Sequence, residues 1–435
     1  METTFDVIVV GAGISGLGAA LKLKDAGLNV LVLEKNSYVG GRMSTEHIDT
    51  FAIDRGATIF GGRFHRMKAL VKKLHLEHLA EEIHFRFALN DGKKITNIRR
   101  GRIDDVLFNS KIGFRGKLAL IRFGISVLLR GRKLGHGNTV NVSHLDDLSV
   151  EDYMQKIGGD DVLEHFLYPG LNGPLGANLR KNSRLILFQT FWNILLMKTW
   201  AIKGGMDAIV NAMAAQLIVR TNAIVEHIKI INDKQVSVTV NGEQLNCEHV
   251  IIALPGNLAA KLCPSLPEHV LQLLRETRFG EMVSAHVMLN KATGNKCAAY
   301  GVSQEVDDGF EIELEHNRVS NLCPEGKGLV SLYMWNEAKH RITEKTDEEV
   351  KARAEEIVRK HFPECANEIV GTHTLRWKEG ICHFSPGRLT QMSALREEMK
   401  NWKLPVQLAG DYLDGIASES ALVTGEQAAE NILRY

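Results

Sequence analysis

The beginning of the chain has the clearest hydrophobic pattern. Residues 5–10 form a short apolar run without alternation, which is typical of a parallel strand covered on both faces. Apolar residues then recur at helical spacing over 14–26 and end at Gly27, a residue type that commonly stops a helix. A second apolar run covers 28–33. This order of strand, helix and strand predicts an α/β fold with a Rossmann-like parallel sheet.

A glycine-rich turn joins the first strand to the first helix. Gly11 permits a tight turn, Gly13 lets the backbone approach a pyrophosphate, and Gly16 lets the helix pack against the strand. Glu34, about 20 residues further on, is placed to bind a ribose diol. Together these features predict a dinucleotide site, and a glycine-rich turn without a ligand is the alternative. The neighbouring residues included in the predicted site are Ile14, Ser15 and Lys35.

A second flexible stretch follows the second predicted strand. Gly40 and Gly41 offer backbone that a ligand can approach, and the guanidinium of Arg42 suits phosphate oxygens. A plain turn is the alternative for the paired glycines. Further along the chain, small residues follow a short predicted strand. A planar ring system could pass close to the backbone of these small residues. The members of this segment in the predicted site are Gly56, Ala57 and Thr58. Up to this point the pattern leaves NAD and FAD both open.

The rest of the chain changes between sheet-like and helical patterns. Residues 221–254 alternate as a β-meander. Residues 80–198 are predicted to be largely helical, whereas 266–384 mixes strands with an amphipathic helix at 347–362. We therefore expect a Rossmann-like nucleotide-binding domain interleaved with an α+β substrate-binding domain. The first would consist of residues 1–79, 199–265 and 385–435, and the second of residues 80–198 and 266–384.

Composition limits the classes of partner. With 53 basic and 52 acidic residues the net charge is +1, so no global field attracts nucleic acid. The six cysteines show no metal-ligand spacing, which favours reduced thiols in the cytoplasm. His75 and His78 share a predicted helix face without a third ligand, so we interpret them as surface residues and expect no metal site. The start of the chain lacks a signal-peptide pattern, and no apolar run is long enough to span a membrane.

These motifs resemble those of the flavin amine oxidase superfamily, which also contains protoporphyrinogen oxidases and carotenoid desaturases. The resemblance begins with the glycine turn, Glu34, the GGR of 40–42 and the DRGA of 54–57. It covers about half of the chain. The further segments that carry it are KGGMDAIVNAMA at 203–214, NAIVEHIKI at 222–230, HVIIALP at 249–255 and VQLAGDYLDGIASESALVTGEQAA at 406–429.

The resemblance implies that the cofactor is FAD. No cysteine lies between 383 and 435, so we expect FAD to be bound non-covalently. In the family pattern the backbone near Val225 meets the adenine, and Asp411 after Gly410 bonds the ribityl chain or the pyrophosphate region. A turn aspartate is the alternative for Asp411. The residues implied to lie beside the pyrimidine edge of the flavin, at a helix N-terminus, are Ala417, Ser418 and Ala421.

The implied reaction is a dehydrogenation. Hydride from a C–N or C–C bond of a small hydrophobic or nitrogenous metabolite would pass to the flavin, and O2 or another acceptor would reoxidise it. Many amine oxidases hold a water with a lysine at the flavin, and Ser284 stands near that place here. A serine in place of that lysine favours the protoporphyrinogen oxidase-like branch or oxidation of cyclic or secondary amines. The alternatives are a non-catalytic flavoprotein and a membrane-associated polyene desaturase.

Candidate substrate contacts follow from position. Trp377, Phe384 and Tyr412 fall where this superfamily often lines its substrate cavity, and aromatic core packing is the alternative. His383 is the titratable side chain of that stretch with an ordinary pKa near neutrality, so it is a candidate base. A surface histidine is the alternative.

One basic segment suggests a further partner. Residues 93–133 hold 12 Lys or Arg against two acids, and 111–133 within it can form an amphipathic helix. Basic flanks suit anionic lipid head groups, so this helix is a candidate for peripheral membrane contact. A helix packed on its own domain is the favoured alternative, because the apolar face is no wider than a core helix needs.

Overall fold

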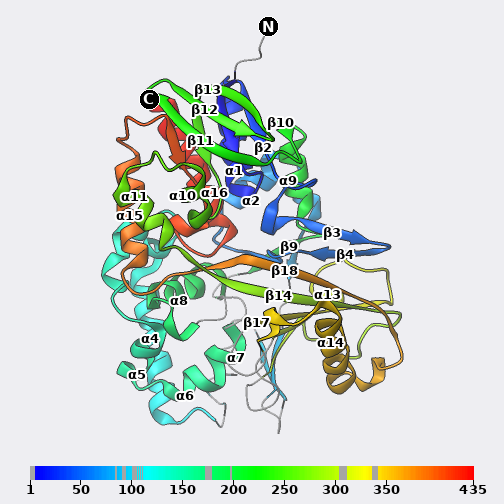
Figure 1. Ribbon diagram of the computed structural model, residues 1–435. Coiled ribbons are helices and arrows are strands. Elements are labelled where there is room, and N and C mark those ends of the chain that lie inside the picture. The colour runs from blue at the N-terminus through cyan, green and yellow to red at the C-terminus, as the bar shows by residue number, and fades with distance from the viewer. Residues whose placement is uncertain are drawn as a thin grey trace.

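A computed structural model of the protein describes residues 5–83, 86–90, 95–99, 105, 107, 109, 111–171, 179–195, 198–302, 311–335 and 341–435. Its upper part in Figure 1 holds the N-terminal strand and the C-terminal helix, and its lower part holds a second sheet beside a group of helices. The chain passes between the two parts several times. The predicted α/β class is confirmed.

The upper sheet has the strand order β10-β2-β1-β13-β12-β11, and β19 pairs with β13. Parallel pairing of β1 with β2 and β13 places the N-terminal strand at its centre. The predicted meander is present as three antiparallel strands. The strands are β1 (Phe5–Val10), β2 (Val30–Leu33), β10 (Ile218–Arg220), β11 (Val225–Asn232), β12 (Gln235–Val240), β13 (Glu243–Ile252) and β19 (Val406–Leu408).

Helices cover both faces of this sheet, which explains why β1 is apolar without alternation. Val7 and Val9 contact one hydrophobic cluster, and Ile8 and Val10 contact another. The helices on the first side are α1 (Ile14–Asp25), α2 (His65–Lys73), α9 (Asp207–Ala214) and α16 (Ser418–Arg434). Those on the second side include α10 (Gly256–Leu262), α11 (Glu268–Arg275) and α15 (Arg388–Met399).

The lower sheet has the order β18-β14-β17-β16-β15-β7-β8. One face packs on α14 (Asp347–His361) through an apolar cluster that includes Val283, Val330 and Ile357. The other face carries buried polar side chains on β14, β16 and β17 beside a small apolar cluster that includes Met288, Leu329 and Leu375. The strands are β7 (Arg86–Asn90), β8 (Ile95–Arg99), β14 (Arg278–Leu289), β15 (Ala299–Val302), β16 (Glu311–Leu314), β17 (Gly328–Trp335) and β18 (Ile369–His383).

The prediction that 80–198 is largely helical is wrong at its beginning. β6 (Ala80–Ile83) pairs with β9 (Thr199–Ile202), and β7 joins β15 in the lower sheet. Long-range strand pairing overrides the local pattern here, because strand preference depends on neighbours more than on sequence. The helices of this segment are α4 (Phe114–Arg130), α5 (Val150–Ile157), α6 (Asp160–Val162), α7 (Tyr168–Leu171) and α8 (Arg184–Thr190).

The five-segment domain division stays a proposal. It is supported by the upper sheet, because its strands come from three stretches separated by the residues of the lower part. Within the described residues, no helix has both the length and the apolar character needed to cross a membrane.

Candidate active site

The glycine turn leaves open space at the N-terminus of α1. Gly11 has a φ of 104°, a conformation that side chains disfavour, and a Cβ on Gly16 would lie 1.9 Å from the Gly11 carbonyl oxygen. Around Gly13 no atom lies within 4 Å of the place where a Cβ would stand. Ser15 Oγ is buried and has no hydrogen-bond partner among the described residues. An open backbone, an unpaired hydroxyl and a helix N-terminus together fit a phosphate group.

Glu34 lies beside this turn at the end of β2. Its Oε2 accepts from the Ala12 N–H at 2.9 Å, and its Oε1 accepts from the backbone and side-chain nitrogens of Asn36 at 2.9 and 2.8 Å. The Glu34 carbonyl accepts from the Ala223 N–H at 2.8 Å, which brings the beginning of β11 and Val225 to the same edge. Lys35 is exposed. The positions of Glu34 and Val225 fit the ribose and adenine end of a dinucleotide.

Arg42 connects the second glycine stretch to the C-terminal motif. Its Nη1 and Nη2 donate to the two Asp411 oxygens at 2.7 and 2.8 Å, and Nη1 also donates to the Gly380 carbonyl at 2.8 Å. Burial would lower the pKa of Arg42, but the Asp411 carboxylate outweighs it and raises that pKa. The Gly40 N–H donates to Ala12 O at 2.8 Å, so this stretch lies against the glycine turn.

The segment 54–58 packs between Arg42 and the lower sheet. A Cβ on Gly56 would lie 2.6 Å from Arg42 O, and the Ala57 N–H donates to the same oxygen at 2.8 Å. Thr58 is buried, and its carbonyl accepts from Arg318. Gly56 is therefore needed for close backbone contact with Arg42, and the place of this segment beside a planar ring stays a prediction.

Helix α16 packs against the N-terminus of α1. Ser418 begins α16, and Ala421 is buried. Thr424 Oγ1 lies 3.1 Å from the Gly410 nitrogen, and a Cβ on Gly425 would lie 2.1 Å from Ser15 O. The first turn of α1 thus contacts α16 at Gly425. The open turn at Gly13 and the unpaired Ser15 hydroxyl fit FAD, whose phosphates the N-terminus of α1 would hold.

The polar face of the lower sheet is buried. Opposite residues of antiparallel strands point to the same face, so the register brings polar side chains from three strands together. One row holds Glu311, Tyr333 and Ser284, and the next holds Glu313, Ser331 and His286. All six are buried. Trp377 continues this face on β18, opposite Met282, and its Nε1 donates to Arg55 O at 2.6 Å. The polar face therefore lies against the segment 54–58.

His286 is held by two serines. Its Nδ1 lies 2.8 Å from Ser331 Oγ, and its Nε2 lies 2.9 Å from Ser284 Oγ. Burial, with smaller effects of His373 and Arg318, lowers the pKa of His286 to about 3. The imidazole is therefore neutral at physiological pH, and it donates to one serine and accepts from the other.

Carboxyl groups outnumber cations in this region. Arg318 is the buried cation, and its guanidinium contacts Glu315 at 2.5 Å, Asp54 at 3.2 Å and Glu313 at 3.7 Å. Glu311 lies one row further along the sheet. Burial and then the charge of Glu313 raise the pKa of Glu311 well above its ordinary value. Three buried carboxyls thus surround Arg318, and the carboxyl of Glu311 lies one row away, which leaves a local excess of acid.

Two atoms on this face have no hydrogen-bond partner among the described residues. They are Tyr333 Oη and Glu313 Oε2, and the second of these has only the Arg318 guanidinium at 3.7 Å. Burial first, and then Glu315, raise the pKa of Glu313 to about 8, although Arg318 opposes this. A buried polar atom without a partner costs about 1–3 kcal/mol, so both atoms are positioned to bind a polar group of a ligand.

Comparison with known proteins identifies the family. The model of the flavin-containing amine oxidoreductases matches residues 14–433. The chain belongs to this family. It is 22% identical to coproporphyrinogen III oxidase of Bacillus subtilis (strain 168), with 99% of this chain and 98% of the other covered.

Solved structures show the same fold. A putative protoporphyrinogen oxidase from Exiguobacterium sp. 255-15 has a TM-score of 0.78 at 16% identity and covers 100% of both chains. Cyclohexylamine oxidase from Brevibacterium oxydans IH-35A has a TM-score of 0.77 at 19% identity and covers 99% of both chains. The protein is therefore an FAD-dependent oxidoreductase with a non-covalent cofactor.

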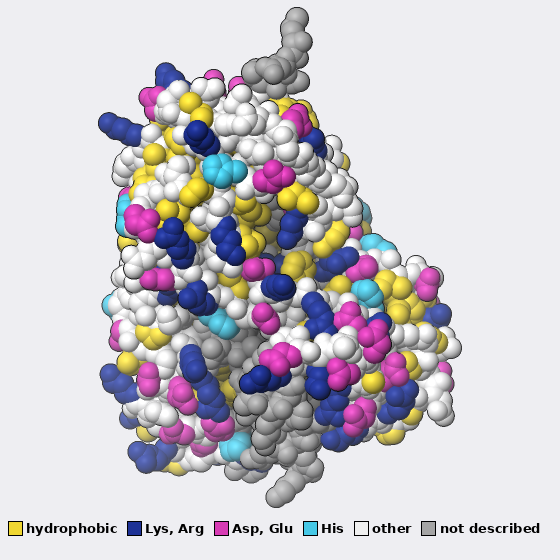
Figure 2. Space-filling model, viewed as in Figure 1, with side chains coloured by type: hydrophobic (Ala, Val, Ile, Leu, Met, Phe, Trp, Pro, Cys, Tyr) yellow, Lys and Arg dark blue, Asp and Glu magenta, His cyan; other side chains and the backbone are white. Residues whose placement is uncertain are grey.

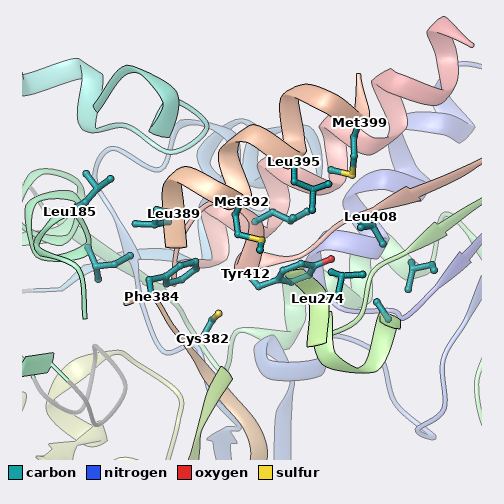
Figure 3. Close-up of a cluster of buried hydrophobic side chains, with 14 of the residues drawn as sticks. Leu185, Leu274, Cys382, Phe384, Leu389, Met392, Leu395, Met399, Leu408 and Tyr412 are labelled. Carbon is teal, nitrogen blue, oxygen red and sulfur yellow. The ribbon is translucent and has the colours of Figure 1, made fainter. Parts of the chain in front are cut away.

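The aromatic candidates for substrate contact lie in two different parts of the structure. Tyr412 is 1% exposed, and Figure 3 shows its ring among Leu274, Met392, Leu395 and Leu408. Burial raises the pKa of Tyr412, so its hydroxyl stays protonated. Phe384 is in the same cluster. These contacts favour the alternative of core packing for both rings.

Trp377 lies nearer the polar face, and His383 lies further along the same strand. Trp377 is partly exposed and touches the 54–58 segment, as described above. His383 is partly exposed at the end of β18, opposite Arg278. It has a further interaction partner in the described part of the chain. Neither position identifies a catalytic base.

Several polar side chains at the site were not predicted. Ser284 was singled out, but Glu311, Glu313, His286, Ser331 and Tyr333 were not. The available signal was the polar residue at every second position of 284–286, 311–313 and 331–333, which is ordinarily a sign of a solvated face. His75 and His78 are exposed, and the described residues contain no group of three metal-ligand side chains.

The raised pKa of Glu313 has a consequence for stability. Its folded-state pKa of about 8 exceeds the ordinary glutamate pKa of 4.5, so its contribution to stability is fully present below about pH 4.5 and is lost as the pH rises through about 8. We expect the melting temperature to fall over this interval in the wild-type protein and to fall less in Glu313→Gln. Thermal unfolding followed by circular dichroism checks this, with Glu348→Gln on exposed helix surface as the control. An equal fall in Glu313→Gln and wild type would contradict it.

Proposed function

We propose that the protein dehydrogenates the C–N bond of a cyclic or secondary amine. When bound, FAD accepts the hydride at its N5 position. The glutamate that pairs with the ammonium group first takes up one N–H proton, which frees the nitrogen lone pair. The C–H bond next to nitrogen then breaks as its hydride leaves for the flavin, the lone pair forms the C=N bond, and water hydrolyses the iminium product to a carbonyl compound and an amine. The chain's own residues bind the nitrogen, orient the C–H bond and exclude bulk water.

The observation that carries this proposal is the excess of buried acid on the polar sheet face. Glu311 and Glu313 share their face with Tyr333, and one arginine cannot compensate all the carboxyls around it. A protonated amine compensates this excess directly, because an opposite charge nearby favours the ionised carboxylate. Binding would therefore release a proton from a glutamic acid and position the amine above the 54–58 segment.

A porphyrinogen is the second candidate, favoured by the similarity to coproporphyrinogen III oxidase along 99% of the chain. A carboxylated porphyrinogen would bring further anions to a face that already has too few cations. A polyene would leave Tyr333 Oη buried against hydrocarbon, with no hydrogen-bond partner. The polar face therefore supports an amine over both.

Turnover in air tests the reaction and the electron acceptor. We expect oxygen uptake with stoichiometric hydrogen peroxide when cyclic or secondary amines are added to the holoenzyme, because we propose O2 as the acceptor. Dye reduction without oxygen uptake would replace O2 by another acceptor. Oxygen uptake with a porphyrinogen and none with any amine would overturn the amine proposal.

Trp377 is proposed to flank the substrate. Trp377→Leu removes the ring and its hydrogen bond to Arg55 O, whereas Trp377→Phe keeps an aromatic surface. We expect flavin reduction by substrate to slow about tenfold or more in Trp377→Leu and less in Trp377→Phe, while FAD content stays unchanged. Stopped-flow reduction measures the rates. Unaltered rates in both variants would show that Trp377 does not contact the substrate. His383 remains a candidate base without a geometric argument.

We also propose a cytoplasmic location at the periphery of a membrane, with 111–133 as the contact. The exposed apolar side chains of α4 within this segment support this location.

A further inference from the structure

Helix α4 carries apolar side chains on two opposite faces. Its inner face packs on the protein, where Gly116, Ala119, Phe123 and Val127 are buried. Phe123 makes edge-to-face contacts with Phe188 and Phe191, with ring centroids 5.0 and 4.7 Å apart. This inner face alone is wide enough to pack the helix against the core.

The outer face is apolar as well and is exposed. Six of the 13 large apolar side chains that are exposed in the described part of the chain lie on this one helix. They recur every three or four residues, and at about 100° per residue they form a single stripe along the side opposite the core. The members and their exposed fractions are Phe114 83%, Leu118 37%, Ile121 47%, Ile125 52%, Leu128 63% and Leu129 80%. Leaving such a row in water is unfavourable.

Basic residues border this stripe. Arg115 and Arg122 lie seven positions apart along one edge, Lys117 lies on the other edge, and Arg132 and Lys133 follow the helix. The helix contains no acidic residue. On the face shown in Figure 2, by contrast, acidic and basic side chains are interspersed.

We propose that the outer face of α4 docks on an anionic lipid bilayer. An apolar stripe bordered by Lys and Arg lets the helix lie in the interfacial plane, with its apolar side chains among the acyl chains and its cations among the phosphates. Long basic side chains at the stripe's edges can reach the head groups from that depth. The inference extends the peripheral contact of the proposed function and does not depend on the substrate.

A second copy of the chain fits this surface less well. A symmetric dimer through α4 would bring Arg115 and Arg122 of both copies into one interface, with no acidic residue on the helix to compensate. The helix is about 25 Å long, so the stripe covers on the order of 250 Å², against roughly 800 Å² per partner in a stable interface. A lipid surface needs no such area and supplies the missing negative charge.

Co-sedimentation of the holoenzyme with vesicles tests the inference. We expect binding to phosphatidylcholine–phosphatidylglycerol vesicles and at least tenfold weaker binding to phosphatidylcholine alone. Ile121→Glu with Ile125→Glu should weaken binding at least tenfold. Arg115→Gln with Arg122→Gln should reduce the preference for phosphatidylglycerol. The control is Ile231→Glu with Val370→Glu, two exposed apolar positions away from α4, and it should bind like wild type. The visible flavin spectrum shows that each variant is folded.

Failure to bind either vesicle would overturn the inference. So would a wild-type dimer in light scattering that Ile121→Glu with Ile125→Glu converts to a monomer, since that assigns the face to a second copy. Vesicle binding without amine oxidation would leave the docking surface intact and reject the reaction instead. The two proposals therefore fail separately.

Discussion

Gly13→Val is expected to prevent FAD binding while the fold stays intact. Gly13 has φ −71° and ψ 173°, which valine adopts without strain, and no atom lies within 4 Å of the Cβ position. The isopropyl group would fill the open space at the N-terminus of α1 where the pyrophosphate is expected. We expect FAD content after purification to fall more than tenfold, with the unfolding free energy of the apoprotein lowered by only about 1 kcal/mol, because Gly13 is the N-cap of α1 and valine is a poorer N-cap.

Gly16→Ala is the matched comparison for this prediction. Its Cβ would lie 1.9 Å from the Gly11 carbonyl oxygen, so the turn itself must distort. We expect that variant to lose both stability and FAD, whereas Gly13→Val loses FAD with little loss of stability. Flavin absorbance per protein and apoprotein denaturation separate the two effects. Full flavin content in Gly13→Val would show that the turn does not hold the pyrophosphate.

Glu311→Gln is expected to lower kcat/KM for an amine substrate about 30-fold. The substitution keeps the shape of the side chain and removes a buried carboxylate that would pair with the substrate cation, at a cost of about 2 kcal/mol. The apoprotein should be no less stable, because the burial that raises the pKa of Glu311 opposes its charged form.

Two neighbours serve as comparisons for this effect. Tyr333→Phe removes only an unpaired hydroxyl, and Glu313→Gln removes a carboxyl that Arg318 already compensates in part. We therefore expect both to have smaller effects on kcat/KM than Glu311→Gln. Steady-state kinetics at several pH values measures them. An unchanged kcat/KM in Glu311→Gln, with normal flavin content, would remove Glu311 from substrate recognition.

The nucleotide-binding half of the fold could be predicted from local sequence. Runs such as 5–10 and 28–33 identify buried parallel strands, and the glycine spacing reflects backbone contacts that the structure shows at Gly11 and Gly16. The second strand was predicted to begin at residue 28, whereas β2 begins at Val30. β6 and β7 could not be predicted, because they pair with β9 and β15, more than 100 residues away along the chain. β8 pairs with its neighbour β7, and the local pattern did not indicate this hairpin.

The substrate side of the site was harder to predict, for a physical reason. Alternating polar residues in β14, β16 and β17 are compatible with a solvated face, and only the packing of 54–58 against the sheet shows that this face is buried. The same ambiguity affects α4, where the sequence shows apolar residues but cannot show that the inner face alone contacts the core. Both features depend on tertiary packing.

Anaerobic titration of the visible flavin band tests whether the protein oxidises amines at Glu311. Cyclic and secondary amines, a porphyrinogen and a polyene are added in turn to the purified holoenzyme and to Glu311→Gln. We expect bleaching by an amine, a much slower response to that amine in Glu311→Gln, and equal bleaching of both proteins by dithionite. Bleaching by the porphyrinogen or the polyene alone, or equal amine rates in both proteins, would contradict amine oxidation at this site.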